Sequence, residues 1–336
     1  MSDPILVEVT RGPIVESAHR GAVAVVDAAG RTVLAIGDID RAVFPRSAVK
    51  GLQALALVES GIADRYGLSE AELALACASH SGEPAHVATA ASMLAKAGRD
   101  AGALECGVHW PNVIAEAGYK LAATGARPGP LHNNCSGKHA GMVCLACGAG
   151  VDPSGYVGRE HYVQQRIAGV LAEVTGAPTD TTAPCGTDGC SIPTFAFPLR
   201  ALALAFARFG SGQGLAGDRA QAAAKLRAAV AQHPFMVAGT ARFDTEIMEI
   251  FGPRLFCKTG AEGVHCAALP EQGLGIAVKC EDGAGRAAQV MLAALAARFL
   301  PMSAEEERRL AALRTPVLKN WNGIEVGLVR PAGVLA

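Results

Sequence analysis

The chain has 336 residues, half of them apolar, and a formal net charge of −1 at neutral pH. Because acidic and basic residues nearly balance and no basic patch or tail stands out, nucleic acid and anionic membranes are not expected as partners. The N-terminus lacks the basic and apolar regions of a secretory leader, and no apolar segment reaches the roughly 20 residues of a membrane span. The ten cysteines are then expected to be thiols or metal ligands, in a cytoplasmic protein.

The N-terminal part of the chain predicts strands followed by helices. Three segments have strand character: residues 5–9, 21–26 and 32–36. Pro45 then opens a helix over residues 47–58, because apolar residues recur there at helical spacing. Ser69 and Glu72 form a capping-box pattern that begins a second helix, and residues 84–97 form a third.

The middle of the chain is rich in alanine and glycine and mainly helical, and strands return near the C-terminus. The expected helices lie at 139–147, 159–175, 218–231 and 285–299, and the expected strands at 255–258, 264–268, 273–279 and 323–328. Strands at both ends with helices between them indicate an α/β (α+β) fold, whose mixed or antiparallel sheet joins the two ends. We therefore expect residues 1–336 to form a single catalytic unit, with a helical lobe at about 60–230.

The first motif that carries chemistry is Ser47-x-x-Lys50, in the helix after Pro45. Residues three apart on a helix share a face, so the amine of Lys50 can reach the hydroxyl of Ser47. A neutral lysine can take the serine proton, and the serine can then attack a carbonyl carbon. Because an exposed lysine has a pKa of about 10.4, this chemistry requires a dry or positively charged site.

A second motif, Lys258-Thr259-Gly260, ends a predicted strand. Serine β-lactamases and penicillin-binding proteins place such a strand opposite the Ser-x-x-Lys helix, and the two motifs follow one another along the chain in the same order here. Together they favour acyl transfer at a serine over a chance match. A dense polar cluster, Ser79-His80-Ser81-Gly82-Glu83, directly follows an apolar run, which is typical of a substrate loop.

Two polar loops contain cysteines beside Asn, Lys, His and Asp: residues 133–139 and 185–190. Thiolates at Cys135 and Cys190 would suit zinc, and His139 or Asp188 could ligate the ion or orient a ligand. The spacing is not that of a zinc finger, but the polar neighbours argue against plain packing of core thiols.

Five segments together resemble the rhizobial-type, or class 3, L-asparaginases: residues 45–50, 78–83, 133–139, 185–190 and 258–263. Residues 9–12 and 279–283 also fit, so the resemblance runs in order over nearly the whole chain. That family is similar in fold to serine β-lactamases and glutaminases. The resemblance implies this fold, hydrolysis of L-asparagine to L-aspartate and ammonia, and L-asparagine as the small-molecule partner.

The resemblance also implies two serine–lysine tandems, Ser47 with Lys50 and Ser79 with Lys258. Ser47, deprotonated by Lys50, would attack the side-chain amide, and water would hydrolyse the aspartyl ester. Candidates to bind the substrate are Arg46, Asn134, His139 and Asp188. A homodimer is expected for an enzyme of this size.

Zinc is the cofactor that the resemblance implies, held by Cys135, Lys138 and Cys190 with water in the fourth position and Asp188 beside it. Lys138 would have to be neutral, which the adjacent dication could enforce. The ion is expected to order loops and position the substrate, and the serine chemistry does not strictly require it. Two alternatives stay open: a β-lactamase-like or penicillin-binding-like serine acyl hydrolase, and a non-catalytic protein that binds zinc or an amino acid.

Overall fold

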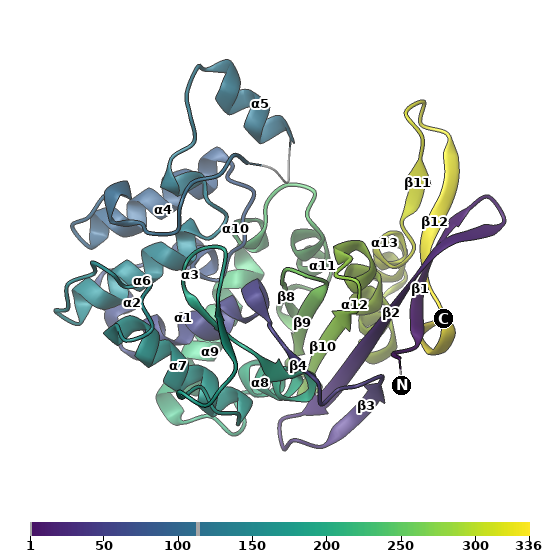
Figure 1. The fold of residues 1–336 in the computed structure, drawn as a ribbon, viewed down its shortest axis with the longest axis horizontal. Coiled ribbons are helices and arrows are strands. Elements are labelled where there is room, and N and C mark those ends of the chain that lie inside the picture. Colours follow the sequence, from purple (N-terminus) through teal and green to yellow (C-terminus); the bar gives the residue numbers. More distant parts are fainter. Residues whose placement is uncertain (1, 112–114) are drawn as a thin grey trace. The chain divides into compact units, whose positions relative to one another are not determined.

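The computed structural model describes residues 2–111 and 115–336, and the chain divides into two compact units. The first unit comprises Met1–Ala48, Phe197–Gly214 and Ile247–Ala336, and it contains the large sheet. The second comprises Val49–Ala196 and Leu215–Glu246, and it is mainly helical. We describe each unit on its own, with the element labels of Figure 1.

The first unit is built on an antiparallel sheet. Its strands are β1 (Ile5–Arg11), β2 (Ile14–Asp27), β3 (Thr32–Ile36), β8 (Phe256–Thr259), β9 (Val264–Leu269), β10 (Leu274–Cys280), β11 (Val317–Lys319) and β12 (Glu325–Pro331). They lie in the order β11-β12-β1-β2-β10-β9-β8, and β3 pairs with β2. Val7 of β1 is opposite Pro331 of β12, so the two ends of the chain meet in one sheet, as the purple and yellow strands of Figure 1 show. The predicted fold class, with a sheet made from both ends, is confirmed.

Helices cover both faces of this sheet. Gly275 of β10 lies against the backbone of helix α8 (Leu199–Ser211), so closely that no side chain fits there. Gly21, which is opposite Cys280 at the other end of β10, lies against Met291 of helix α12 (Gly285–Phe299). Because residues 275 and 280 are an odd number apart along one strand, they point to opposite faces. The sheet is therefore enclosed between α8 and α12.

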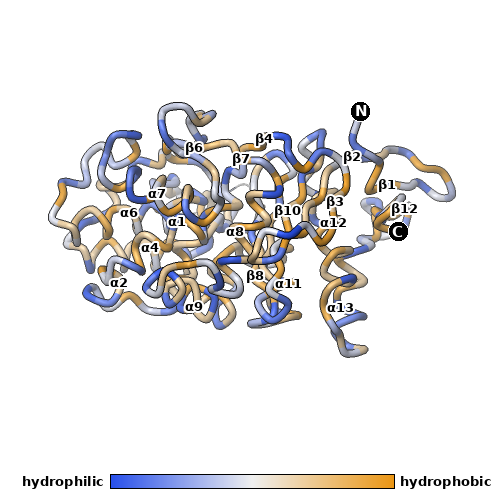
Figure 2. Tube along the Cα trace, turned by 90° about the horizontal axis from the view of Figure 1, so that it is seen from below, coloured by the Kyte–Doolittle hydropathy of each residue, from blue (hydrophilic) through white to orange (hydrophobic). Residues whose placement is uncertain are grey.

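The first unit also contains the turn that carries the predicted serine. This turn is the 3-10 helix η1 (Arg46–Val49), and it follows the short strand β4 (Ala42–Val43), which pairs with β7 (Phe197–Pro198). Helix α13 (Ala304–Arg314) exposes most of its surface, and Figure 2 shows it with blue hydrophilic segments alternating with orange ones.

The second unit is a packed set of helices: α1 (Lys50–Glu59), α2 (Ile62–Arg65), α3 (Glu70–Ala76), α4 (Pro84–Lys96), α5 (Ala115–Ala123), α6 (Ser136–Gly148), α7 (Tyr162–Thr175), α9 (Gly217–Gln232) and α10 (Pro234–Val237). Helix α6 is buried from Ser136 to Ala146 and packs against α1, α3, α4 and α7. Gly137 makes this possible, because a Cβ there would overlap the backbone of Leu75 in α3. A small hairpin of β5 (Cys185–Thr187) and β6 (Pro193–Phe195) completes the unit.

Most of the predicted elements are confirmed within a few residues at their ends. The capping box at Ser69 forms as expected, and the helix predicted at 285–299 has those bounds. The predicted helix at 47–58 differs in its first turn, which is a 3-10 helix that leads into α1. The sequence analysis missed α8, α11 (Phe243–Phe251) and α13. Within residues 2–111 and 115–336, no helix is both long enough and apolar enough to cross a membrane.

Candidate active site

Lys50 is a buried lysine of the helical unit, with only 1% of its surface exposed. Its Nζ donates hydrogen bonds to Ala78 O at 2.7 Å and Ser79 Oγ at 2.8 Å, and it contacts Cys135 Sγ at 3.1 Å. Burial lowers the pKa of Lys50, the nearby Cys135 thiolate acts against this, and the charge of Lys138 adds to it. The structure thus places a buried amine with a lowered pKa against a serine hydroxyl.

Two thiols and a second lysine adjoin this amine. Lys138 Nζ donates to Cys190 Sγ at 2.9 Å, and Cys190 shares a hydrogen bond with Cys135. That hydrogen bond lowers the pKa of Cys135 well below its usual value, against the effect of burial, and Lys50 and Lys138 lower it further. The same bond raises the pKa of Cys190. Cys135 is therefore the thiolate of the pair, and Cys190 is the thiol that donates to it.

Lys138 remains the cationic partner of this pair. Burial, the largest influence, lowers its pKa, but the negative charge of Cys135, the hydrogen bond with Cys190 and the charge of Asp188 together outweigh it, so the pKa of Lys138 is raised. Within the helical unit, the sequence-predicted ligands Cys135, Lys138 and Cys190 therefore converge on one point. Two sulfurs and one amine are soft and borderline donors of the kind that zinc prefers. The donor set fits zinc, provided that Lys138 loses its proton to the ion.

Ser79 lies on a loop that a pair of stacked histidines orders. His80 and His86 stack with ring centroids 4.9 Å apart, and His86 stacks on Phe235 at 4.7 Å. Gly82 N donates to His80 Nδ1 at 3.1 Å, so the ring proton is on Nε2, which lies 2.9 Å from Ser136 Oγ. Burial, then the charges of His86 and Lys50, lower the pKa of His80 well below its usual value. The imidazole of His80 is therefore neutral, and it supports the loop that carries Ser79.

A second loop, residues 238–242, is tied to the Ser79 loop, and the sequence analysis missed it. Arg242 Nη1 contacts Ser81 Oγ at 3.2 Å and Ser79 O at 3.4 Å. Thr240 donates both its N–H, at 2.9 Å, and its hydroxyl, at 2.7 Å, to the carboxylate of Glu83. The only signal in the sequence is a Gly-Thr-Ala-Arg run at 239–242, which is too short to predict a site.

Ser47 and Lys258 belong to the sheet unit, where the structure brings the segments that carry them close together. Gly260, at the end of β8, approaches the Ser47 turn so closely that a Cβ would lie 2.5 Å from Pro45 O and 3.3 Å from Ala48 Cβ. Lys258 is fully buried, and its Nζ donates to Thr259 O at 2.9 Å. The Lys-Thr-Gly strand end thus packs on the turn that carries Ser47. The pairings of Ser47 with Lys50 and of Ser79 with Lys258 stay predictions.

Strained backbone marks the same places. Among the described residues, the non-glycine positions with positive φ are Arg46 at 51°, Ser191 at 78°, Ala241 at 54° and Glu262 at 56°. Three of these precede or follow a candidate site residue, Ser47, Cys190 or Arg242. Such conformations are uncommon for side chains with a Cβ and cluster at functional sites.

The other predicted binding residues have different surroundings. His139 is fully buried, with Nδ1 2.6 Å from Tyr156 Oη, which favours a role inside the helical unit over direct contact with a substrate. Asn134 links the loop of residues 133–139 to the Ser79 loop, because its backbone carbonyl accepts a hydrogen bond from His80 N at 3.2 Å. Asp188 Oδ1 accepts from Cys190 N at 3.2 Å, at the tip of the β5–β6 hairpin.

A buried lysine bonded to a serine, in a protein whose antiparallel sheet is enclosed by helices, indicates an enzyme of the mixed α/β class. The family model of L-asparaginase II matches residues 7–331. The chain therefore belongs to the L-asparaginase II family, and it is an asparaginase, an amidohydrolase that acts on a linear amide. Family membership decides against the two alternatives that the sequence left open.

Several solved structures are similar to the chain. One is a β-lactamase from Mycobacterium bovis, with 17% identity and a TM-score of 0.42 over 80% of this chain and 89% of that chain. Another is a protein titled Mglu, with 18% identity and a TM-score of 0.36 over 87% of this chain and 67% of that chain. No curated protein matches the chain.

Proposed function

We propose that this asparaginase hydrolyses L-asparagine to L-aspartate and ammonia through an acyl-serine intermediate, with Lys50 as the base. The contact that carries the proposal is the one between Lys50 Nζ and Ser79 Oγ, 2.8 Å long and buried. Ala78 O can only accept a hydrogen bond, so one N–H of Lys50 must point at it. This hydrogen bond fixes the orientation of the Lys50 amine. When the amine is neutral, its lone pair is then available to accept a proton from a hydroxyl or a thiol.

The nucleophile of the proposal is Ser47. Its Oγ attacks the side-chain amide carbon, Lys50 accepts the hydroxyl proton, and that proton passes to the leaving nitrogen, which departs as ammonia. Water then attacks the aspartyl ester, gives a proton back through Lys50 to Ser47, and releases L-aspartate. Ser79, bonded to Lys50, would relay these protons, and Lys258 would complete the activation from the Lys-Thr-Gly strand.

Arg242 is our first candidate for holding the α-carboxylate of the substrate. It is half-buried beside Ser79, where a guanidinium can bind a carboxylate through two parallel hydrogen bonds. Arg46 is the second candidate, because its strained backbone precedes Ser47. Asp188 is the candidate for the α-amino group, and Asn134 would support the loop between them.

The metal of the proposal is zinc, held by Cys135, Lys138 and Cys190. When bound, it would supply a fixed positive charge that orders the two loops and positions the substrate. The chain would provide two buried sulfurs and an amine as ligands. In the absence of the ion, these three groups are hydrogen-bonded to one another. A cytoplasmic location and a homodimer are also part of the proposal, and light scattering of the purified protein tests the dimer.

Ammonia release from L-asparagine by Ser47→Ala and Ser79→Ala, with Ser60→Ala as control, tests the assignment. Ser60 lies at the end of α1, where its hydroxyl donates to Leu57 O and accepts from Ile62 N, so its variant should retain activity. Ser47→Ala should lose ammonia release while staying folded, and Ser79→Ala should be slowed. Full activity of Ser47→Ala would overturn Ser47 as the nucleophile, and full activity of both would overturn the acyl-serine route.

A further inference from the structure

Away from the residues used so far, one face of the sheet carries a histidine, a cysteine and an aspartate side by side. Cys280, the last residue of β10, is opposite Gly21 of β2, and His19 lies two residues before Gly21 on the same strand. Residues paired across an antiparallel ladder share a face, as do residues two apart on a strand. The register therefore brings His19 and Cys280 to one face, and Asp282 follows in the turn before α12.

The carboxylate of Asp282 bridges the other two side chains. Its Oδ2 lies 2.6 Å from His19 Nδ1, and Cys280 Sγ donates to its Oδ1 at 2.9 Å. The ligand atoms of the three residues all lie within 4.8 Å of one another. His19 and Cys280 are buried, whereas the side chain of Asp282 is 51% exposed. One side of the cluster is thus closed and the other is open to an ion arriving from solvent.

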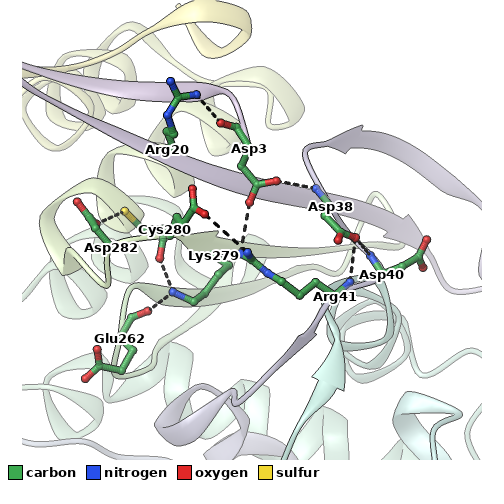
Figure 3. A network of polar contacts seen from close by, with 10 residues as sticks. Asp3, Arg20, Asp38, Asp40, Arg41, Glu262, Lys279, Cys280 and Asp282 are labelled. Carbon is green, nitrogen blue, oxygen red and sulfur yellow. Dashed lines mark hydrogen bonds and ion pairs between the residues drawn. The ribbon is translucent and has the colours of Figure 1, made fainter. Parts of the chain in front are cut away.

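Two observations distinguish this cluster from an ordinary hydrogen-bonded turn. First, the cations nearby are engaged elsewhere: Lys279 Nζ donates to Glu262 O and Cys280 O, and Arg41 pairs with Asp3 (Figure 3). Asp282 therefore contacts a histidine and a thiol although lysine and arginine are close by. Second, His19 Nε2 is buried without a hydrogen-bond partner, so no wider polar network holds this ring.

Glycines let the surrounding backbone close tightly on the cluster. A Cβ at Gly21 would lie 2.6 Å from Lys279 O and 2.9 Å from Met291 Cε. A Cβ at Gly283 would lie 2.9 Å from Glu262 Oε2, so a second carboxylate adjoins the turn of Asp282. Figure 3 shows Glu262, Cys280 and Asp282 around the end of β10.

We propose that His19, Cys280 and Asp282 form a zinc site in the sheet unit, separate from the Cys135, Lys138 and Cys190 cluster. One imidazole nitrogen, one thiolate and one carboxylate are a donor set that suits Zn²⁺, with solvent in the fourth position. The ion takes the place of the protons that the three groups share, and the half-exposed Asp282 moves outward to make room. It joins β2, β10 and the start of α12.

Cobalt titration of the full chain, after chelator and reductant treatment, tests the site, because Co²⁺ bound to a thiolate gives a charge-transfer absorption. The titration uses a Cys135→Ser/Cys190→Ser background, in which the other cluster cannot contribute. This background should still bind one equivalent of Co²⁺ with thiolate absorption. Adding Cys280→Ser should remove the absorption. Asp282→Asn should weaken Co²⁺ binding by more than about tenfold, because loss of a residue that only supports a metal ligand already costs about that much affinity. The control Cys147→Ser, a half-buried thiol in the other unit, should change neither.

Absence of thiolate absorption in the background variant, or its persistence after Cys280→Ser, would overturn the proposal. If the background variant does not fold, the same titration compares the unaltered chain with Asp282→Asn. That substitution keeps the shape of a half-exposed side chain, and it should weaken Co²⁺ binding at one site by more than about tenfold. Unchanged affinity at every site would overturn the proposal, and neither result depends on the asparaginase mechanism.

Discussion

At the scale of single residues, Lys50 is the group on which the proposed chemistry depends. Burial lowers its pKa, so the uncharged fraction at neutral pH is larger than for an exposed lysine. Activity should rise with pH as Lys50 loses its proton and fall as pH decreases through the lowered pKa, with the midpoint below the ordinary lysine value of about 10.4. The pH profile of kcat/KM measures this. A midpoint at the ordinary lysine value would contradict the role of burial.

Lys50→Arg should keep the positive charge and remove the base, because arginine does not lose its proton in proteins. Loss of a general base costs about 10²–10⁴-fold in kcat. Ammonia release measures the loss, and thermal unfolding checks that the variant is folded. Lys225→Arg, at a half-buried residue of α9 that pairs with Asp64, is the control and should be fully active. A Lys50→Arg variant with wild-type kcat would exclude Lys50 as the base.

Arg242→Gln should raise KM for L-asparagine by about 10–100-fold, the range expected for a lost hydrogen bond to a charged group. L-Asparagine amide, which lacks the α-carboxylate, separates substrate binding from support of the Ser79 loop. If Arg242 grips the carboxylate, the substitution should have little effect on that substrate. An equal effect on both substrates would show that Arg242 acts only through Ser79 and Ser81.

The residue types of the proposed site can be recognised in the sequence, whereas their contacts cannot. Ser47, Lys50, Ser79 and the cysteine loops stand out because their motifs are short and local. The contact of Lys50 with Ser79 joins residues 29 positions apart, and Arg242 reaches Ser79 across 163 positions. Such contacts depend on how helices pack, which no local spacing records.

At the scale of elements, the end of β8 packs tightly against the turn that carries Ser47. Gly260→Ala should destabilise the protein by about 1–3 kcal/mol and reduce activity, because its Cβ would lie 2.5 Å from Pro45 O and must push the turn aside. Gly285→Ala is the matched control, since its Cβ would meet nothing within 4 Å at the start of α12. Thermal unfolding and ammonia release measure both. A Gly260→Ala variant with unchanged activity and stability would contradict the tight contact.

Helix α8 shows why some elements escaped prediction. Its sequence Leu-Arg-Ala-Leu-Ala-Leu-Ala-Phe-Ala alternates large and small apolar residues, so a period of two competes with the helical period. Packing against the sheet favours the helix, because Gly275 lets the α8 backbone lie directly on β10. Where the period was unambiguous, as in residues 285–299, the prediction had the right bounds.

At the scale of the whole molecule, the pairing of the two chain ends was predicted from the distribution of strands. The register was not, because β2 is 14 residues long and pairs with β1 along its first half and with β10 along its second. A bulge at Val9 and Thr10 also shifts the pairing with β1. These features arise from long-range contacts and from the turn geometry at each strand end.

Zinc should stabilise the whole chain by mass action. An ion at 100 times its Kd adds about 2.7 kcal/mol to the free energy of unfolding, so chelation should lower Tm. Cys280→Ser, which removes the thiolate of the His19, Cys280 and Asp282 cluster, provides a background for the Cys135, Lys138 and Cys190 cluster, and there Cys190→Ser should abolish the zinc-dependent shift. A chelator that leaves Tm unchanged in this background would contradict zinc at the Cys135, Lys138 and Cys190 cluster. A chelator that leaves Tm unchanged in the Cys135→Ser/Cys190→Ser background would contradict zinc at the His19, Cys280 and Asp282 cluster.

The most direct test of the central claim is to find the acyl group. L-Asparagine is mixed with the enzyme, the reaction is quenched in acid during turnover, and the peptides are mapped by mass. We expect an aspartyl ester on Ser47, and none in Lys50→Arg. Unmodified serines in an enzyme that is releasing ammonia at its full rate would contradict the acyl-serine mechanism.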